Sequence, residues 1–258
     1  MFEPMASVPG SVPQTGRVAV VIGGERGVGA AVVRALASRG HAVAIHAQGS
    51  LQEARDLADQ LVAAGVPSLA VTANLRDEGP VRAMVQRVAD HFGRLDAVVT
   101  CAVMRHAVPL EEVTADDLRA HFDINCVGTF VVAQEAGGFM SRQPDGGCIV
   151  TLCEAVTDQP AADLTPYLPS QGAIPAMTRS LAADFAARNP RVRVNCVLPG
   201  PVTLSADMDP EARAAVIAGT LVHREGTPEH VAHAVLFLLE NDFVTGVCLP
   251  VDGGRTIA

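Results

Sequence analysis

The chain has 258 residues, of which 49% are hydrophobic and 18% charged, and its formal net charge is −9. These values predict one large α/β domain with a sizeable core, and no apolar run reaches the ~18 residues that a membrane span needs. The acidic balance and the lack of a basic cluster argue against nucleic acid and anionic membranes as partners.

The six cysteines and eight histidines show neither a Cys-x-x-Cys pair nor a metal-ligand spacing. Buried reduced thiols explain the cysteines best, so we expect a cytoplasmic protein without a metal site. Residues 1–15 are rich in Pro, Ser and Gly and lack the features of a secretory signal, which predicts a flexible tail. Residues 16–258 are expected to form the single domain.

The predicted elements alternate between strand and helix along the chain. In order they are a strand over 17–22, a helix over 30–39, a strand over 42–45, a helix over 51–64, a strand over 68–73, a helix over 78–92, a strand over 95–101, helix over most of 114–140, a strand over 148–153, a helix over 167–188, a strand over 192–197, helices over 210–218 and 228–240, and a strand over 246–251. Strands joined by single helices pair in parallel through right-handed crossovers. We therefore predict a doubly wound, three-layer α/β sandwich of the Rossmann type with about seven parallel strands.

A glycine-rich turn separates the first predicted strand from the first helix. Gly23, Gly27 and Gly29 have the spacing Gly-x-x-x-Gly-x-Gly, with Val28 inside the turn. Glycines at this place allow a tight turn and a close approach of the backbone to a dinucleotide pyrophosphate at the helix N-terminus. The alternative is a plain turn, but the strand before it and the helix after it favour a nucleotide site.

The end of the second predicted strand bears on the choice of nucleotide. Sites that prefer NAD place an acid there, whereas this chain has His46 and no carboxylate until Glu53. Arg26 in the glycine turn and Ser50 can meet a 2′-phosphate. The sequence thus favours NADP(H), with NAD(H) as the alternative.

A second candidate site lies between residues 152 and 171. The strand over 148–153 delivers Glu154 at its carboxyl end, and the next helix carries Tyr167 and, one turn later, Gln171. Residues four apart share a helix face, so an acid, a phenol and an amide can converge on one crevice. An acid and a phenol placed in this way can give a proton to a substrate oxygen. The alternative is a surface acid beside a half-buried core tyrosine.

With both motifs placed, the chain resembles the short-chain dehydrogenase/reductase family from about residue 16 to 258. The resemblance implies an NAD(P)(H)-dependent enzyme that assembles as a homotetramer or dimer. It also implies the roles of the matching positions, which are Gly23, Gly27 and Gly29 in the cofactor turn, Asn74-Leu75 at the adenine, Ala102 in the altered Asn-Asn-Ala-Gly stretch, Asn125 and Tyr167 in catalysis, Pro199-Gly200 beside the nicotinamide, and Val251-Asp252-Gly253-Gly254 near the C-terminus.

Within the family, the chain is most similar to the pteridine reductases, which carry an acid thirteen residues before the tyrosine. Glu154 stands there in place of the usual serine. Several departures accompany this likeness: Gln171 replaces the catalytic lysine, Arg105 stands where the pterin-stacking aromatic residue is expected, and Gly49 replaces the arginine beside Ser50.

The missing lysine leaves two hypotheses for the function. In the family its charge lowers the tyrosine pKa and its ammonium holds the nicotinamide ribose; a glutamine can donate to the ribose but brings no charge. Oxidation needs a phenolate and should suffer, whereas a neutral phenol can still donate a proton in reduction. We expect an NADPH-dependent reductase of a small carbonyl or imine-type substrate, pteridine-like rings included. The alternative is a silent member that serves as a nucleotide-binding or structural subunit, or pairs with an active relative.

The expected oligomer would form through the two long helices, over 114–140 and 167–188. We expect a partner to cover an apolar set on the second helix; it comprises Ala173, Ala176, Met177, Leu181 and Phe185.

Overall fold

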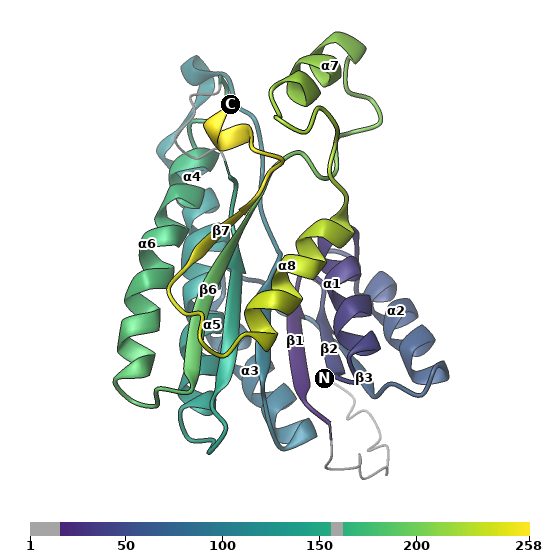
Figure 1. The fold of residues 1–258 in the computed structure, drawn as a ribbon. Helices are drawn as coiled ribbons and strands as arrows, with labels where there is room; N and C mark the ends of the chain where they lie inside the picture. The colour runs from purple at the N-terminus through teal and green to yellow at the C-terminus, as the bar shows by residue number, and fades with distance from the viewer. Residues whose placement is uncertain (1–15, 156–161) are drawn as a thin grey trace.

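The computed structural model describes residues 16–155 and 162–258, so the predicted tail over 1–15 lies outside the described residues. One parallel sheet runs through the centre with the strand order β3-β2-β1-β4-β5-β6-β7 (Figure 1). Its strands are β1 (Val18–Ile22), β2 (Ala42–His46), β3 (Ser68–Val71), β4 (Ala97–Thr100), β5 (Gly147–Leu152), β6 (Val192–Pro199) and β7 (Cys248–Val251). The doubly wound fold is confirmed, and the order reverses between β1 and β4, where such sheets bind ligands.

Helices cover both faces of the sheet. One layer contains α1 (Gly27–Ser38), α2 (Leu51–Ala63) and α8 (Pro228–Glu240), and the other contains α3 (Glu78–Phe92), α5 (Thr129–Met140) and α6 (Tyr167–Ala186). Alternate residues of β1 feed the two cores, because Val20 packs with the α3, α5 and α6 layer while Val21 packs with the α1, α2 and α8 layer. This two-sided burial explains why the strands are almost continuously apolar.

The long helix predicted over 114–140 is interrupted. It consists of α4 (Ala115–Phe122), a π-helical segment η2 (Asp123–Gly128) and α5. Thr114 caps α4 through a reciprocal pair of hydrogen bonds with Asp117, 2.8 Å and 3.2 Å long. The wider turn of η2 was not predicted, and it carries Asn125. Such π-turns within helices are frequent at functional sites.

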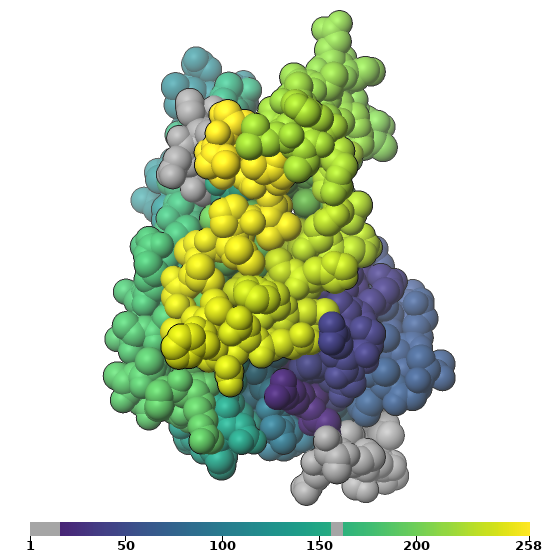
Figure 2. Space-filling view, viewed as in Figure 1, coloured from purple at the N-terminus to yellow at the C-terminus, as the bar shows by residue number. Residues whose placement is uncertain are grey.

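Three other elements complete the described chain. The 3-10 turns η1 (Leu110–Glu112) and η3 (Arg255–Ile257) were not predicted, whereas α7 (Pro210–Ala218) lies where a helix was expected. No residue of α7 is buried. It projects beyond the carboxyl ends of the strands, and the space-filling view shows it standing out from the surrounding surface (Figures 1 and 2).

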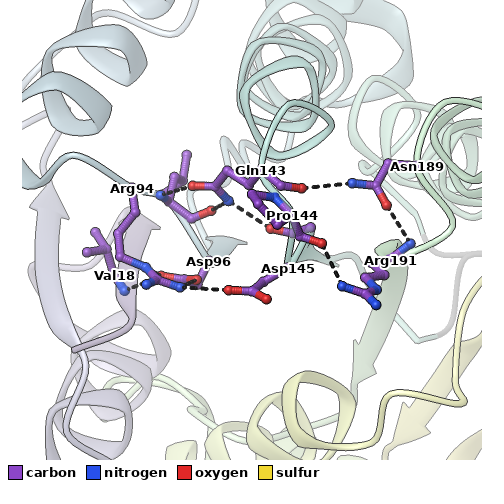
Figure 3. A network of polar contacts seen from close by, with 10 residues as sticks. Val18, Arg94, Asp96, Gln143, Pro144, Asp145, Asn189 and Arg191 are labelled. Carbon is purple, nitrogen blue, oxygen red and sulfur yellow. Dashed lines mark hydrogen bonds and ion pairs between the residues drawn. The ribbon is translucent and has the colours of Figure 1, made fainter. Parts of the chain in front are cut away.

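At the opposite side of the molecule, a network of polar side chains connects the amino-terminal ends of the strands (Figure 3). Arg94 donates twice to Asp96, at 2.8 Å and 2.6 Å, and Asp96 accepts from the backbone of Val18 at 2.7 Å. The Gln143 side chain accepts from the Leu95 N–H and donates to the Leu95 carbonyl, and the Gln143 carbonyl accepts from the Asn189 amide. A hollow of about 550 Å³ opens here. Because Arg94 already faces carboxylates, we regard this edge as structural.

The expected partner face on α6 is wrong for two of its five residues. Leu181 and Phe185 are buried in the protein's own core, where the ring of Phe185 packs against Gly137 of α5. Of the five, only Ala176 is exposed, whereas Ala173 and Met177 are half-buried. The error has a simple cause: an apolar stripe on a helix marks burial, but the sequence does not say whether the sheet or a second chain covers it.

Candidate active site

The glycine turn is shaped by contacts that exclude side chains. Gly23 has a φ of +72°, and a Cβ there would lie 2.7 Å from the backbone of Ala102. A Cβ on Gly29 would collide with the carbonyl oxygen of Gly23. The turn therefore closes tightly over the N-terminus of α1, whose first turn holds no acidic side chain. Free backbone N–H groups at a helix N-terminus suit a phosphate.

His46 braces this turn from behind. Its Nδ1 accepts a hydrogen bond from the Gly23 N–H at 3.2 Å, and its Nε2 donates to the Ala73 carbonyl at 2.9 Å. Burial lowers the pKa of His46, which favours the neutral ring that this pattern requires. The ring has no exposed surface, so the His46 side chain supports the turn, and a contact of His46 with the cofactor stays a prediction.

One residue of the turn was not predicted from the sequence as a binding residue. Glu25 has a buried carboxylate oxygen, Oε2, with no hydrogen-bond partner among the described residues. A ribose hydroxyl is the kind of donor that such an oxygen lacks. A dinucleotide therefore fits this turn through the backbone for its phosphates and through Glu25 for a sugar. Nothing in the sequence pattern distinguished Glu25 from an ordinary exposed acid.

The residues expected around the adenosine end lie on the rim of the turn. Arg26 is exposed, and Ser50 caps α2 by accepting from the Glu53 N–H at 3.3 Å. Asn74 is exposed and folds its amide onto Arg76 and Asp77. The Leu75 side chain is buried in the core, so only its backbone is available to a cofactor.

A cavity of about 160 Å³ opens between the glycine turn and α6. It gathers most of the residues predicted for the nicotinamide side, although larger hollows exist elsewhere on the molecule. The lining residues are Val28, Cys101, Ala102, Val103, Leu152, Cys153, Glu154, Tyr167, Gln171, Pro199 and Gly200. Parallel strands present their ligand sites at the carboxyl ends, and β4, β5 and β6 all end at this cavity.

Glu154, Tyr167 and Gln171 form one hydrogen-bonded set. The Tyr167 hydroxyl donates to Glu154 Oε2 at 3.0 Å, and the Glu154 N–H donates to Gln171 Oε1 at 3.0 Å. Because the oxygen of Gln171 faces that N–H, its amide nitrogen is left as a donor, with no partner among the described residues. Tyr167 is 3% exposed and Gln171 4%, so the set is held rigidly.

The phenol is kept neutral. Burial raises the pKa of Tyr167 well above its usual value, and the charge and hydrogen bond of Glu154 raise it further, while Arg105 acts in the opposite direction. A phenol in this environment can donate its proton to a substrate, but it is ionised to the phenolate only at strongly alkaline pH.

Asn125 lies behind the cavity and does not line it. Its Oδ1 accepts from the Met104 N–H at 2.7 Å, and its Nδ2 donates to the Met104 carbonyl and to Ser170 Oγ, both at 2.9 Å. Ser170 in turn donates to the Tyr167 carbonyl at 2.6 Å. Asn125 therefore fastens the loop after β4 to the first turn of α6. These contacts give Asn125 a positioning role, and its part in catalysis stays a prediction.

Neither a metal-ligand cluster nor a membrane-spanning helix is found in the described parts of the chain. Over 16–155 and 162–258, no three His, Cys, Asp or Glu side chains lie together as metal ligands. Within those same ranges, no helix has the length and apolar character that crossing a bilayer requires.

Comparisons with known proteins agree with this geometry. A family model described as enoyl-(acyl carrier protein) reductase matches residues 22–256. The chain is 36% identical to cis-4-hydroxycyclohexanecarboxylate dehydrogenase of Sinomonas cyclohexanicum, over 93% of this chain and 96% of the relative. It is 33% identical to a putative ketoacyl reductase of the granaticin polyketide synthase of Streptomyces violaceoruber, over 92% and 95%.

A solved structure extends the comparison. A blue fluorescent protein from a metagenomic library, crystallised with NADPH, superposes with a TM-score of 0.85 at 34% identity, over 93% of this chain and 98% of that one. Fold, glycine turn and relatives point to the same conclusion. The chain belongs to the short-chain dehydrogenase/reductase family of NAD(P)-dependent oxidoreductases.

Proposed function

We propose that this protein is an NADPH-dependent reductase of a small carbonyl or imine-type substrate, with Tyr167 as the proton donor. The observation that carries the proposal is the bond from the Tyr167 hydroxyl to Glu154, 3.0 Å long, at the wall of the cavity beside the cofactor turn. The cofactor supplies a hydride when it is bound. The chain's own task is to bind it, orient the substrate and deliver the proton.

Several residues suit the binding task. The backbone of the glycine turn would hold the pyrophosphate, and Glu25 Oε2 would accept from a ribose hydroxyl. Arg26 and Ser50 supply a cation and a hydroxyl on the rim, which supports NADP(H) over NAD(H). The amide nitrogen of Gln171 can donate to the second ribose.

The electrostatics favour reduction over oxidation. A phenol with an ordinary pKa near 10 is only about 0.1% ionised at neutral pH, and burial lowers this fraction for Tyr167. All 19 basic residues of the chain are arginines, so no lysine elsewhere can replace the one absent at Gln171. Reduction needs only that the neutral phenol release its proton to the substrate as charge develops on the substrate oxygen.

The substrate class rests on the size of the cavity and on the relatives. A space of about 160 Å³ admits a small reacting group. The names of the two curated relatives refer to a ketoacyl group and to a hydroxy acid, which supports a carbonyl–alcohol pair here. Pterins belong to the imine-type class and remain in the test panel, although Arg105 stands where a stacking ring is expected.

The silent-subunit hypothesis is favoured by one observation, the replacement of the lysine by Gln171. The two hypotheses separate in a simple experiment. NADPH binding is measured by fluorescence, and NADPH consumption is then followed with ketones, oxo acids, quinones and pterins.

A reductase should turn over at least one class of substrate. Tyr167→Phe should lower that rate at least tenfold without weakening NADPH binding, because a positioned general acid contributes roughly 10²–10⁴-fold. Tight NADPH binding without turnover of any substrate would establish the silent subunit instead.

We also propose that the protein assembles as a homotetramer, with a dimer as the simpler alternative. Large apolar side chains are exposed in two separate regions: Leu118 and Val127 on α4 and η2, and Phe237 and Phe243 near the end of α8, with Phe243 98% exposed. Two distinct faces suit a closed tetramer. Sedimentation at micromolar concentration tests this, and a monomer would contradict it.

A further inference from the structure

Arg105 lies against the proposed proton donor without a partner for its charge. Its guanidinium carbon is 5.7 Å from the centre of the Tyr167 ring, which is within the range of a cation–π contact. The residue is exposed. Among the described residues, no carboxylate forms an ion pair with it and no acceptor receives a hydrogen bond from it.

The backbone on both sides of Arg105 is fixed. On one side, Met104 exchanges two hydrogen bonds with the Asn125 amide, 2.7 Å and 2.9 Å long. On the other side, the His106 N–H donates to Nε2 of buried His121 at 3.3 Å, and His121 Nδ1 donates to the Asp117 carbonyl at 2.7 Å. Because the backbone is fixed, binding of a ligand has only the side-chain rotamers of Arg105 left to order.

The cavity lining supplies no positive charge of its own. The residues that line it include one acid, Glu154, and no cation. Arg105 therefore brings the positive charge to the mouth of this cavity. A planar guanidinium pairs with a carboxylate through two parallel hydrogen bonds.

We propose that Arg105 is a specificity-determining residue and that the substrate is an oxo acid. Its carboxylate pairs with Arg105 on one side of the phenol while its carbonyl oxygen faces the Tyr167 hydroxyl. The carboxylate must lie on the Arg105 side of the ring, because Glu154 repels an anion on the other. The position of the carbonyl rests on the proposed reductase function, whereas the carboxylate subsite does not require turnover.

Matched acids and esters test this subsite by binding alone. Pyruvate, acetoacetate and levulinate, each beside its methyl ester, are titrated calorimetrically into the protein saturated with NADP⁺, and hydroxyacetone phosphate is the competing anion. We expect at least one acid to bind about tenfold more tightly than its ester, as one charge-assisted contact predicts. The preference should decrease as salt is raised.

Variants assign the preference to the residue. Arg105→Gln should remove the acid preference, and Arg105→Lys should restore part of it. Arg188→Gln is the matched control, because that exposed arginine also stacks on a ring, at 5.8 Å from the centre of Phe185, near the far end of α6. It should leave the preference unchanged.

The remaining outcomes overturn the proposal. They are equal binding of acid and ester, no binding of either, an acid preference that survives Arg105→Gln, and a phosphate that binds more tightly than every acid. NADPH turnover is measured separately. An acid that binds through Arg105 while no compound of the panel consumes NADPH refutes the reductase and keeps the subsite, whereas esters bound as tightly and reduced as fast as their acids do the reverse.

Discussion

Restoring the lysine tests the electrostatic argument directly. Gln171 lies one helical turn from Tyr167, and both side chains contact Glu154, at 3.0 Å in each case. In the Gln171→Lys variant an ammonium would stand beside the phenol in a buried environment. It would favour the phenolate by direct attraction and would also neutralise Glu154, whose charge now opposes ionisation.

The expected shift follows from Coulomb's law. Two unit charges ~5 Å apart interact by ~3 kcal/mol at an effective dielectric constant of ~20, which corresponds to ~2 pKa units. Because Tyr167 and Gln171 are 3% and 4% exposed, solvent screening removes little of this effect. If the phenolate limits alcohol oxidation, the reverse rate at neutral pH should rise by up to about 100-fold.

The composition makes the measurement clean. Tyr167 is the only tyrosine and there is no tryptophan, so near-ultraviolet absorbance during an alkaline titration reports this phenol alone. In the wild type we expect ionisation only as the protein unfolds, because burial raises the pKa of Tyr167. The stability that the neutral phenol contributes is then lost as pH rises above its unfolded value of ~10.

In the Gln171→Lys variant the absorbance change should precede the loss of helical circular dichroism. The introduced side chain is also the only lysine of the chain, so its own titration can be followed without assignment. Gln86→Lys adds the same charge on the exposed side of α3 and should change nothing. Identical phenol titrations in Gln171→Lys and the wild type would refute the argument.

Four further predictions concern the turn and the core. Arg26→Ala should reduce the preference for NADPH over NADH by about tenfold, which is the lower end for a charge-assisted contact because Arg26 is exposed. Glu25→Gln should weaken the binding of NADPH and of NADH equally. Titration of each variant with both nucleotides at fixed salt distinguishes these effects. His46 has a pKa lowered by burial, so the stability it contributes is present above the unfolded value of ~6.5 and is lost as pH falls; His46→Gln should flatten this acid slope in urea denaturation. Gly137→Ala should cost about 1–3 kcal/mol because its Cβ meets the Phe185 ring, whereas Gly138→Ala, with open space around it, should not destabilise α5.

Hydrophobic patterning was enough to predict the sheet and most helices. Strands such as β1 and β5 are buried on both faces, and this burial is visible in the sequence as unbroken apolar runs. The π-helical turn at η2 was not predictable, because α4 buries only His121 and so has no apolar stripe against which a shift of one residue could be seen.

The candidate site was predicted where chemistry depends on spacing along the chain. Glu154, Tyr167 and Gln171 were expected to converge, and they do. The roles of His46 and Arg105 were not predictable, because the residues around them come from distant parts of the chain. A histidine at a strand end can equally face a ligand or support a neighbouring turn, and only the folded chain brings Arg105 over the phenol.

The π-helical turn has a consequence for insertions and deletions in this helix. In an α-helix each residue advances by about 100° around the axis, so η2 acts as an extra residue inserted between α4 and α5. Deleting one residue between Asp123 and Gly128 would offer the backbone a regular α-helix. The shorter α-turn would span nearly the same angle as the longer π-turn, so α4 and α5 would keep their relative orientation.

The change would therefore fall on the π-turn itself. Val132, Ala136 and Met140 of α5 would stay in the core, whereas the turn that directs Asn125 toward Met104 and Ser170 would be lost. We expect such a deletion to fold and to loosen the loop that carries Arg105. The extra residue thus serves the active site without disturbing the half of the helix that packs on the sheet.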